Sequence, residues 1–335
     1  MNIVSCYLAD EDQRDAKCLA RKVLLPMRSA KFVNKLPRRS DRLGRRLRCI
    51  QIYNVMEPLS WHPSVETMTI CKSSMPCIHK PWVSLKTLII EQSEYNGNIN
   101  PRDFPNLEIL DLHMCANFNE DIRSFKHMRK IFITHCYEFN GHLHHLDNLV
   151  YLHLCRTPLF SSDITRLPRL QTLVVFQNDG FNGRFRDLPQ LKRLVVHSGV
   201  FNRPLDELIE LEDLDLITPL FTETIGAKPK LQKLNMHSLV FDQSLPSLPA
   251  CMEFAIDAEA FNQSIPEMPC LRRFHLFSLH FNRPIRLFEG LLRLSLDACL
   301  FDAPLEFPDS VEYLELLTKY EQYSGSLRLM RCRGL

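Results

Sequence analysis

Glycine is scarce in this sequence, with 10 residues among 335, so no stretch resembles a flexible glycine-rich linker. No apolar run approaches the roughly 20 residues that a membrane-spanning helix needs. The formal net charge is only +2, which gives no overall field favouring nucleic acid or a membrane surface as a partner. The motifs GxSxG, HExxH, GxGxxG and the Walker-type loop are also missing. We therefore expect no enzymatic activity and no cofactor.

A Cys-x-x-Cys pair is likewise lacking, although the chain has 12 cysteines. This pattern favours a reducing compartment, where thiols pack as small apolar side chains. Residues 1–13 lack the basic start and the apolar core of a signal peptide. We therefore expect a cytoplasmic or nuclear protein, and the alternative is a secreted disulfide framework.

What the sequence does contain is an internal repeat. An aromatic residue recurs every twenty residues, usually followed by Asn or Asp, at Phe181, Phe201, Phe221, Phe241, Phe261, Phe281 and Phe301. A fixed period of this length is typical of a solenoid, in which each repeat buries its apolar side against its neighbours. The chain is therefore expected to be elongated rather than globular.

A ladder of alternating apolar pairs runs in step with the aromatic residues. In Leu-x-Leu the two Leu side chains face one side of a strand and the central residue faces the other. The pairs predict about fourteen strands, centred on Ile50, Met68, Leu88, Leu110, Ile131, Leu152, Leu173, Leu194, Leu214, Leu234, Phe254, Phe274, Leu294 and Leu314 and on the residue two places after each. The spacing is irregular at first, then twenty-one, then twenty. Twenty residues leave no room for a full helix, so the return segment must be extended or a single helical turn.

Two further columns are interpreted as structural. We expect the Asn or Asp after each aromatic residue to bond local backbone in its turn. These residues are Asn119, Asn140, Asn182, Asn202, Asp242, Asn262, Asn282 and Asp302. A small residue after each strand indicates a tight bend repeated in register. The clearest examples are Ser198, Thr218, Ser238, Ala258, Ser278, Ala298 and Thr318.

The N-terminal segment, residues 1–46, differs from the solenoid of residues 47–335. Residues 1 to about 25 show the apolar spacing of two short helices around an acidic turn. A run of arginines between Arg38 and Arg48 follows. It is a localisation signal, an anion-binding patch or, as we favour, a solvated linker. The fold expected is thus an α/β-type, mostly β solenoid of leucine-rich-repeat-like parallel strands with a small helical N-terminal cap.

The repeats from about residue 85 to 320 resemble FNIP repeats, relatives of leucine-rich repeats found mainly in social amoebae and large viruses of amoebae. The resemblance is carried by Phe-Asn-Arg-Pro-Leu at 201–205 and Phe-Asn-Arg-Pro-Ile at 281–285. The sequence departs from it where Phe160 is followed by Ser161 and Phe221 by Thr222. The resemblance implies a binding scaffold, often joined to an N-terminal F-box, and the host cytoplasm if the chain is viral.

Residues 1–25 resemble the later part of an F-box, the helical module that docks on the Skp-type adaptor of cullin-RING ubiquitin ligases. The residues that would contact the adaptor are Ile3, Val4, Tyr7, Leu8 and Leu19. The usual Leu-Pro opening is absent, as is the Trp expected soon after Arg21. A helical cap that shields the first rung is the alternative, because end rungs need covering.

His and Cys residues are dense between His113 and Cys155. A zinc site needs four ligands converging at about 2.0 to 2.3 Å. Cys115 and Cys136 fall in one column, just after their strands, where leucine-rich repeats place Asn or Cys. Hydrogen bonding within the bend explains both thiols, so we favour a structural role over a metal site.

The outward side of the predicted strands is the remaining place for function. Exposed aromatic, His and basic residues on a rigid sheet suit protein recognition. The expected partner-binding residues on this concave face are Lys130, Phe132, Phe176, Arg193, His197, Lys233, His237, Arg273, Phe277 and Arg293. We interpret the chain as a non-enzymatic interaction scaffold that recognises substrates for a cullin-RING ligase. The alternative is a leucine-rich-repeat binding protein with no ligase link.

Overall fold

The computed structural model describes residues 29–33, 48–54, 64–73, 80–92, 99–303, 305 and 308–317. The predicted F-box-like residues and the arginine run as far as Arg46 lie outside these ranges. Within them the structure contains strands and turns but no helix. The helical N-terminal cap therefore has no counterpart in the part of the chain that is described.

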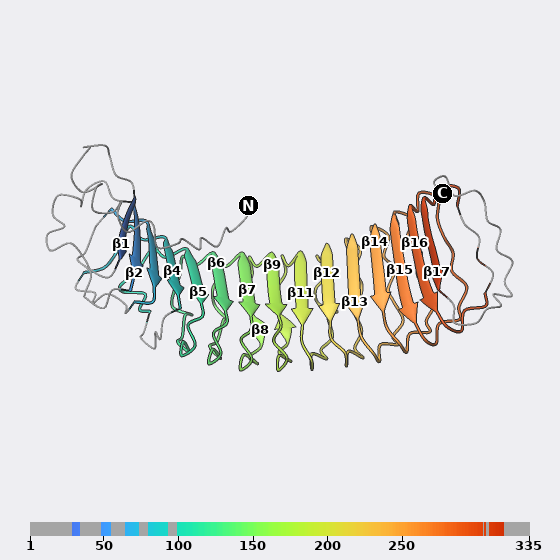
Figure 1. The fold of residues 1–335 in the computed structure, drawn as a ribbon, viewed down its shortest axis with the longest axis horizontal. Helices are drawn as coiled ribbons and strands as arrows, with labels where there is room; N and C mark the ends of the chain where they lie inside the picture. The colour runs from blue at the N-terminus through green and yellow to red at the C-terminus, as the bar shows by residue number, and fades with distance from the viewer. Residues whose placement is uncertain are drawn as a thin grey trace.

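Fifteen strands form one parallel sheet whose order follows the sequence from β1 to β17, with β8 and β10 outside it (Figure 1). The first eight strands of the sheet are β1 (Ser29–Val33), β2 (Cys49–Tyr53), β3 (Thr67–Cys71), β4 (Thr87–Glu91), β5 (Ile109–His113), β6 (Lys130–Thr134), β7 (Tyr151–Cys155) and β9 (Thr172–Phe176). The other seven are β11 (Arg193–His197), β12 (Asp213–Ile217), β13 (Lys233–His237), β14 (Glu253–Asp257), β15 (Arg273–Ser278), β16 (Arg293–Ala298) and β17 (Tyr313–Leu317). The short strands β8 (Ile164–Thr165) and β10 (Phe185–Arg186) pair with each other on the return side.

All fourteen strands predicted from the Leu-x-Leu ladder are present. Each pairs in register with its neighbours, as when Leu214 of β12 lies beside Leu234 of β13. Within this sheet, sequence reasoning missed β1, which lies within the segment assigned to the N-terminus and pairs with β2 from Ser29–Cys49 to Val33–Tyr53. The short return-side strands β8 and β10 were also not predicted. The sheet therefore begins earlier than residue 47.

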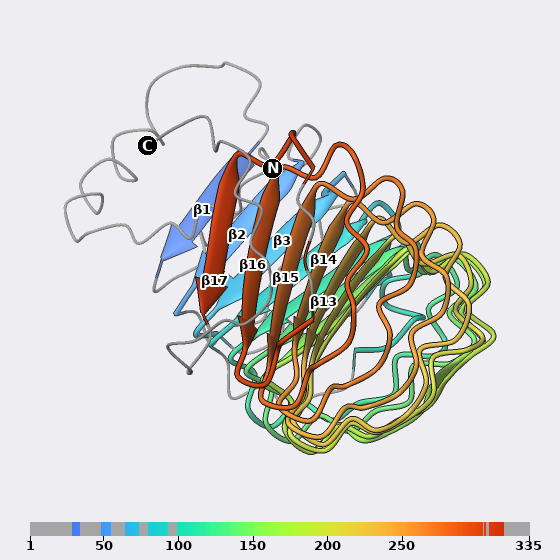
Figure 2. The same ribbon diagram turned by 90° about the vertical axis from the view of Figure 1, so that its right-hand side faces the viewer.

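The rungs stack into a shallow arc. The sheet lies along the concave side of the arc and the return segments lie along the convex side (Figure 1). Seen from the end, the sheet and the return segments close around a single elongated core (Figure 2). The inward residues of the strands, such as Leu214 and Leu216, are fully buried in this core.

The change from twenty-one to twenty residues has a local structural cause. In the longer rungs one residue directly after the strand has a positive φ, as at Met114 (54°), His135 (55°), Arg156 (52°) and Gln177 (51°). In the rung after β11, Ser198 follows the strand directly, and no residue at this position has a positive φ in the later described rungs. The shorter rung thus omits the left-handed residue that directly follows the strand, a conformation that is costly for side chains other than Gly.

The recurring aromatic residues form a column inside the return side. From Phe118 to Phe301 consecutive rings stack with centroids 5.7–6.1 Å apart and interplanar angles of 2–23°. Phe281 lies between Phe261 and Phe301, as predicted, and is fully buried. Offset or parallel stacking of this kind adds to the free energy gained by burying each ring.

The residues after the aromatic column are structural, but their partners differ from the prediction. We expected these Asn and Asp side chains to bond backbone within their own turn. Instead the side-chain oxygen of Asn202 accepts a hydrogen bond from the backbone N–H of Thr222, the equivalent residue of the next rung, at 2.9 Å. Asn119 does the same for Asn140 at 2.8 Å, and Asn182 for Asn202 at 3.0 Å. The sequence pattern identified the column but could not reveal that the bonds cross between rungs.

The small polar residues after the strands serve the bend, as predicted. The hydroxyl of Ser198 donates to the carbonyl of Phe181 at 2.7 Å, and that of Ser278 to the carbonyl of Phe261 at 2.8 Å. These side chains are buried, so their hydrogen bonds satisfy groups that water cannot reach.

Candidate functional site

The outward side of the sheet, hereafter the strand face, carries every partner-binding residue proposed from the sequence. The first residue of each strand forms one column, the third a second column and the fifth a third. Lys130, Arg193, Lys233, Arg273 and Arg293 lie in the first column, and Phe132 lies in the second. The third column holds Phe176, His197, His237 and Phe277. All ten side chains are exposed or half-buried, so the geometry permits the binding role, which stays a prediction.

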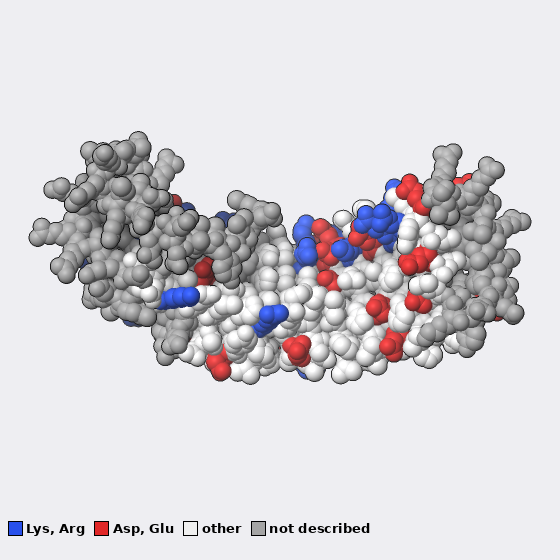
Figure 3. Space-filling model, viewed as in Figure 1, with Lys and Arg blue, Asp and Glu red and all other residues white. Residues whose placement is uncertain are grey.

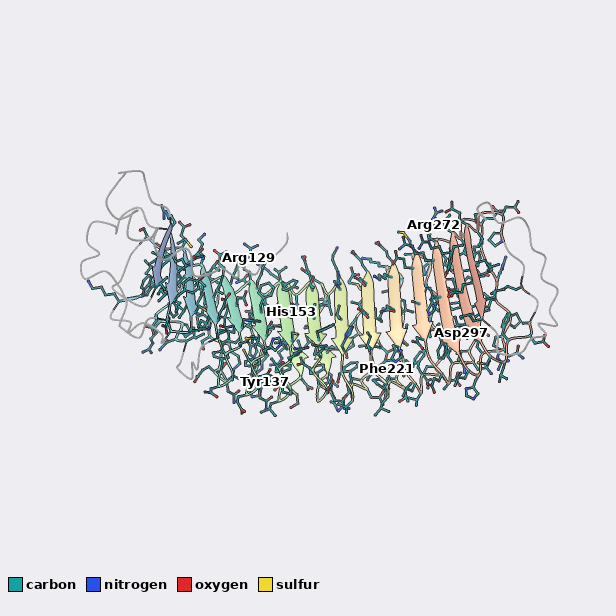
Figure 4. The ribbon with its side chains drawn as sticks, in the orientation of Figure 1. Arg129, Tyr137, His153, Phe221, Arg272 and Asp297 are labelled. Atoms are coloured by element: carbon teal, nitrogen blue, oxygen red, sulfur yellow. The ribbon has the colours of Figure 1, made fainter. Side chains whose placement is uncertain are left out.

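Aromatic side chains gather on β6, β7, β9 and β11. The ring of Phe132 lies 5.0 Å from that of Tyr151 and 6.2 Å from that of His153, between centroids. Beside them the ring of Phe176 lies 4.5 Å from that of His197. We call these five residues the aromatic patch, and Figure 4 shows His153 midway along its strand, β7. Burial among these rings lowers the pKa of His153, which favours its neutral form at physiological pH.

The strand face becomes ionic from β11 onward. Figure 3 shows basic and acidic side chains gathered along the upper edge of this half of the arc. Arg193 pairs with Asp213 at 3.5 Å. Burial raises the pKa of Asp215, but the interaction with His197, whose Nε2 lies 3.4 Å from the carboxylate, and the hydrogen bond from Asn235 outweigh this effect and hold the pKa below its usual value. The Asn235 amide donates to this carboxylate at 2.8 Å.

A hollow of about 440 Å³, hereafter the basic hollow, lies on the strand face over β13 to β17. Its outward lining consists of Lys233, Asn235, Glu253, Ala255, Arg273, His275, Arg293, Ser295 and Tyr313. The hollow exists because Ala255, in the second column, presents only a methyl group between Asn235 and His275. It therefore combines an open floor with three basic side chains on its wall.

The sequence predicted that Lys233, Arg273 and Arg293 share one column, and the strand register confirms this. The prediction did not include the acidic residue between them, Glu253. Glu253 lies between Lys233 and Arg273 and pairs with both, at 3.9 Å and 2.7 Å. Counting twenty residues from Lys233 would have found Glu253, because the period fixes the column. Tyr313, on the far side of Arg293, was also missed.

A second hollow, of about 730 Å³, lies where β3 to β9 begin. Its walls include an ion pair between Lys86 and Glu108 at 3.4 Å and a longer one between Arg129 and Glu108 at 4.0 Å. Figure 4 shows Arg129 at the edge of the sheet where the strands begin. Asp297, near the C-terminal end of the sheet, lies toward the edge where the strands end. The charges here are largely compensated by one another, so this hollow is a weaker candidate than the basic hollow.

The His and Cys cluster does not converge on one point. No group of three or more His, Cys, Asp or Glu residues suited to a metal ion occurs among the described residues. Within their own bends the thiol of Cys115 contacts the carbonyl of His113 at 3.7 Å, and that of Cys136 contacts the carbonyl of Thr134 at 3.6 Å. Cys115 also reaches the carbonyl of Ile90, in the preceding rung, at 3.4 Å. These bonds agree with the role in the bend that the sequence indicated.

The sequence also led us to expect reduced cysteines, and it contained no apolar run long enough to span a membrane. The eight cysteines within the described ranges are all free thiols. No helix in the same ranges is long and apolar enough to cross a membrane.

The geometry thus defines a parallel β-solenoid with leucine-rich-repeat-like rungs and an exposed strand face. No family model matches the sequence, and no curated protein matches it. A solved structure that is similar is the crystal structure of CroV588, described as a novel circular LRR protein structure. It shares 14% sequence identity with a TM-score of 0.32, and the match covers 81% of this chain. The chain spans about half the length of that protein, 56%, and the likeness in overall shape is weak.

Proposed function

We propose that the protein is a non-enzymatic interaction scaffold that binds a partner protein on its strand face. The observation that supports the proposal is the aromatic patch, where Phe132, Tyr151 and Phe176 present ring surface to solvent on a rigid sheet. Aromatic side chains of this kind dominate the binding energy of many protein interfaces. Each ring is held by neighbouring strands, so little conformational entropy is lost when a partner binds.

The test compares the strand face with the return side. The intact protein, Phe132→Asp and Tyr137→Asp are each used to capture partners, which are identified by mass spectrometry. Tyr137 is a matched control because it is also exposed, at 49%, but lies on the return side (Figure 4). A partner retained by Tyr137→Asp and lost by Phe132→Asp, with equal melting temperatures, supports the proposal. A partner that binds Phe132→Asp undiminished contradicts it.

We further propose that the scaffold recognises substrates for a cullin-RING ubiquitin ligase. The support is the resemblance of residues 1–25 to part of an F-box and of the rungs to FNIP repeats. Ile3, Val4, Tyr7, Leu8 and Leu19 would then cover an apolar surface of the Skp-type adaptor, since exposed apolar patches mark partner surfaces. Without this link, the protein is a leucine-rich-repeat binding protein whose N-terminus caps the first rung.

The two versions predict different outcomes for one double variant. In the ligase version, Tyr7→Asp with Leu8→Asp abolishes co-purification of adaptor and cullin and leaves strand-face binding unchanged, because rungs are stabilised by their neighbours. In the capping version, the double variant lowers the melting temperature instead. Failure of the intact protein to bring down the adaptor would end the ligase version and leave the scaffold proposal standing.

A further inference from the structure

We propose that the basic hollow over β13 to β17 binds a carboxylate side chain from an acidic peptide segment of the partner. The inference rests on the proposed scaffold function and names the chemistry that the strand face recognises. The carboxylate would lie between Arg273 and Arg293, whose positions are adjacent in the first column of the sheet. Adjacent parallel strands are about 4.8 Å apart, a spacing that lets one carboxylate accept hydrogen bonds from both guanidinium groups.

The three cations of the basic hollow, Lys233, Arg273 and Arg293, outnumber the acids of their column that line it, since only Glu253 lies among them. Lys233 and Arg273 share the single carboxylate of Glu253, at 3.9 Å and 2.7 Å. Among the described residues, no ion pair involves Arg293, whose neighbours in the column are Arg273 and Tyr313. Two adjacent guanidinium groups repel each other, so an incoming anion relieves this repulsion as well as gaining hydrogen bonds.

The hollow also has room for a side chain and its backbone. Ala255 leaves the floor open, and the half-exposed ring of Tyr313, at 50%, forms a wall beside Arg293. Its volume of about 440 Å³ falls within the range of pockets that hold small ligands. A peptide crossing the strands could therefore place an acidic side chain in the hollow without displacing a protein side chain.

The surrounding acids favour a carboxylate over a phosphate group. Glu253 lies in the same column as the two arginines, and Glu315 lies on the next strand, where it accepts a hydrogen bond from Ser295 at 3.0 Å. Lys233, Arg273 and Arg293 against these two acids leave a net charge of only +1, and a phosphate group carries nearly twice the charge of a carboxylate at neutral pH. Attraction to the hollow rises in proportion to the ligand charge, whereas the cost of removing the ligand from water rises more steeply, so the doubly charged group gains less. The site as built therefore fits a singly charged acidic side chain.

The test uses fluorescein-labelled, C-terminally amidated peptides and the intact protein, with binding followed by fluorescence polarisation. One peptide carries a run of glutamates, the second carries glutamines in their place, and the third carries a phosphoserine among glutamines. We expect the glutamate peptide to bind, the glutamine peptide not to bind, and the phosphoserine peptide to bind more weakly than the glutamate peptide. Equal binding of the glutamine peptide, tighter binding of the phosphoserine peptide, or no binding of the glutamate peptide would overturn the proposal.

Three variants locate the site. Arg293→Gln should weaken binding of the glutamate peptide by about tenfold or more, the loss expected for hydrogen bonds to charged groups. Ala255→Leu should weaken it without changing any charge, because the larger side chain fills the floor of the hollow. Lys126→Gln is the control, since Lys126 is an exposed cation that lies outside the hollow and is not one of the proposed partner-binding residues, and this variant should bind the peptide as the intact protein does.

Equal weakening by Lys126→Gln would mean that the peptide senses only the overall charge, and it would refute a specific site. Equal melting temperatures of the variants establish that folding is intact. Capture of the partner through Phe132 is measured separately, so loss of peptide binding alone refutes this inference and leaves the scaffold function in place.

Discussion

The backbone N–H of Asn282 donates a hydrogen bond of 3.1 Å to the side-chain oxygen of Asn262, the equivalent residue of the preceding rung. The N–H of Asn262 in turn donates to Asp242 at 2.8 Å, and Asn282 accepts from the N–H of Asp302 at 2.9 Å. A single column of side chains thus connects the return segments in turn from Asp242 to Asp302. Arg283 adds a further contact between rungs, since its side-chain N–H donates to the carbonyl of Asn262 at 3.2 Å. Three residues of the Phe-Asn-Arg-Pro motif therefore hold neighbouring rungs together.

Asn262→Ala should lower the free energy of unfolding by about 1 kcal/mol, because the N–H of Asn282 loses its acceptor. Asn262→Asp is the matched variant and should cost less, since a carboxylate also accepts this bond, as Asp242 already does one rung earlier. Urea unfolding followed by circular dichroism gives both values. Equal losses in the two variants would mean that the hydrogen bond between rungs does not stabilise the fold.

Phe281→Ala should lower the free energy of unfolding by about 3 to 5 kcal/mol, because a fully buried ring is removed from between Phe261 and Phe301. The loss should spread to adjacent rungs, which share the contact, and hydrogen exchange should show faster exchange there. Tyr137→Ala provides the control, since that exposed ring contributes little. A melting temperature unchanged by Phe281→Ala would contradict the stacked column.

Lys228 occupies an inward position that holds Leu208 in the preceding rung and Leu248 in the next. Its side chain is fully buried, and its amine donates to the carbonyls of Leu205 at 3.0 Å and Ala227 at 3.2 Å. Burial lowers the pKa of Lys228 from 10.5 to about 8, although the nearby charge of Asp206 opposes the shift. The folded state therefore binds the proton less tightly than the unfolded state.

The free energy of unfolding should consequently rise with pH between about 8 and 10.5, where the unfolded chain still holds a proton that the folded chain has released. The full rise is about 3 kcal/mol, from 1.36 kcal/mol for each unit of pKa. Lys228→Met should lose this contribution to the slope, while the missing hydrogen bonds lower stability at every pH. Denaturant unfolding across this range measures the slope, and parallel curves for the two proteins would contradict the assigned pKa.

Asp111 should produce a slope of the opposite sign in acid. Burial, and secondarily the charge of Glu91 on the neighbouring strand, raise the pKa of Asp111 from 3.8 to about 6. The folded state then binds the proton more tightly, so stability contributed by this group is present below about pH 4 and is lost as the pH rises through 6.

Asp111→Asn should therefore raise the free energy of unfolding near pH 7 by up to about 3 kcal/mol and have little effect near pH 4. Glu91→Gln should recover part of this gain, because it removes the smaller cause and leaves the burial of Asp111 unchanged. Denaturant unfolding of the variants and the intact protein near pH 4 and near pH 7 measures these differences in the free energy of unfolding. A gain from Asp111→Asn that is the same at both values would show that charge is not its cause.

The sequence predicted which residues of the candidate site face outward and which share a column, but it did not predict the contacts between side chains on different strands. The alternation of side chains along a strand put Lys233, Arg273 and Arg293 on the outward side, and the period put them in one column. The compensating role of Glu253 and the open floor above Ala255 depend on distances between side chains on different strands. Such distances follow from the stacking of rungs and cannot be obtained from periodicity alone.

The sequence by itself determined the parallel solenoid of residues 49–317, because repeats of twenty residues with inward Leu pairs bury their apolar side by stacking on their neighbours. It could not identify β1, since residues 29–33 carry no repeat motif before them and their pairing with β2 depends on long-range contacts. Only the tertiary structure decided that the Asn column bonds across rungs, and that the twenty-first residue lies at a positive φ after the strand, as at Met114. Both depend on where one rung lies against the next, which is a property of the stacked chain and not of any single repeat.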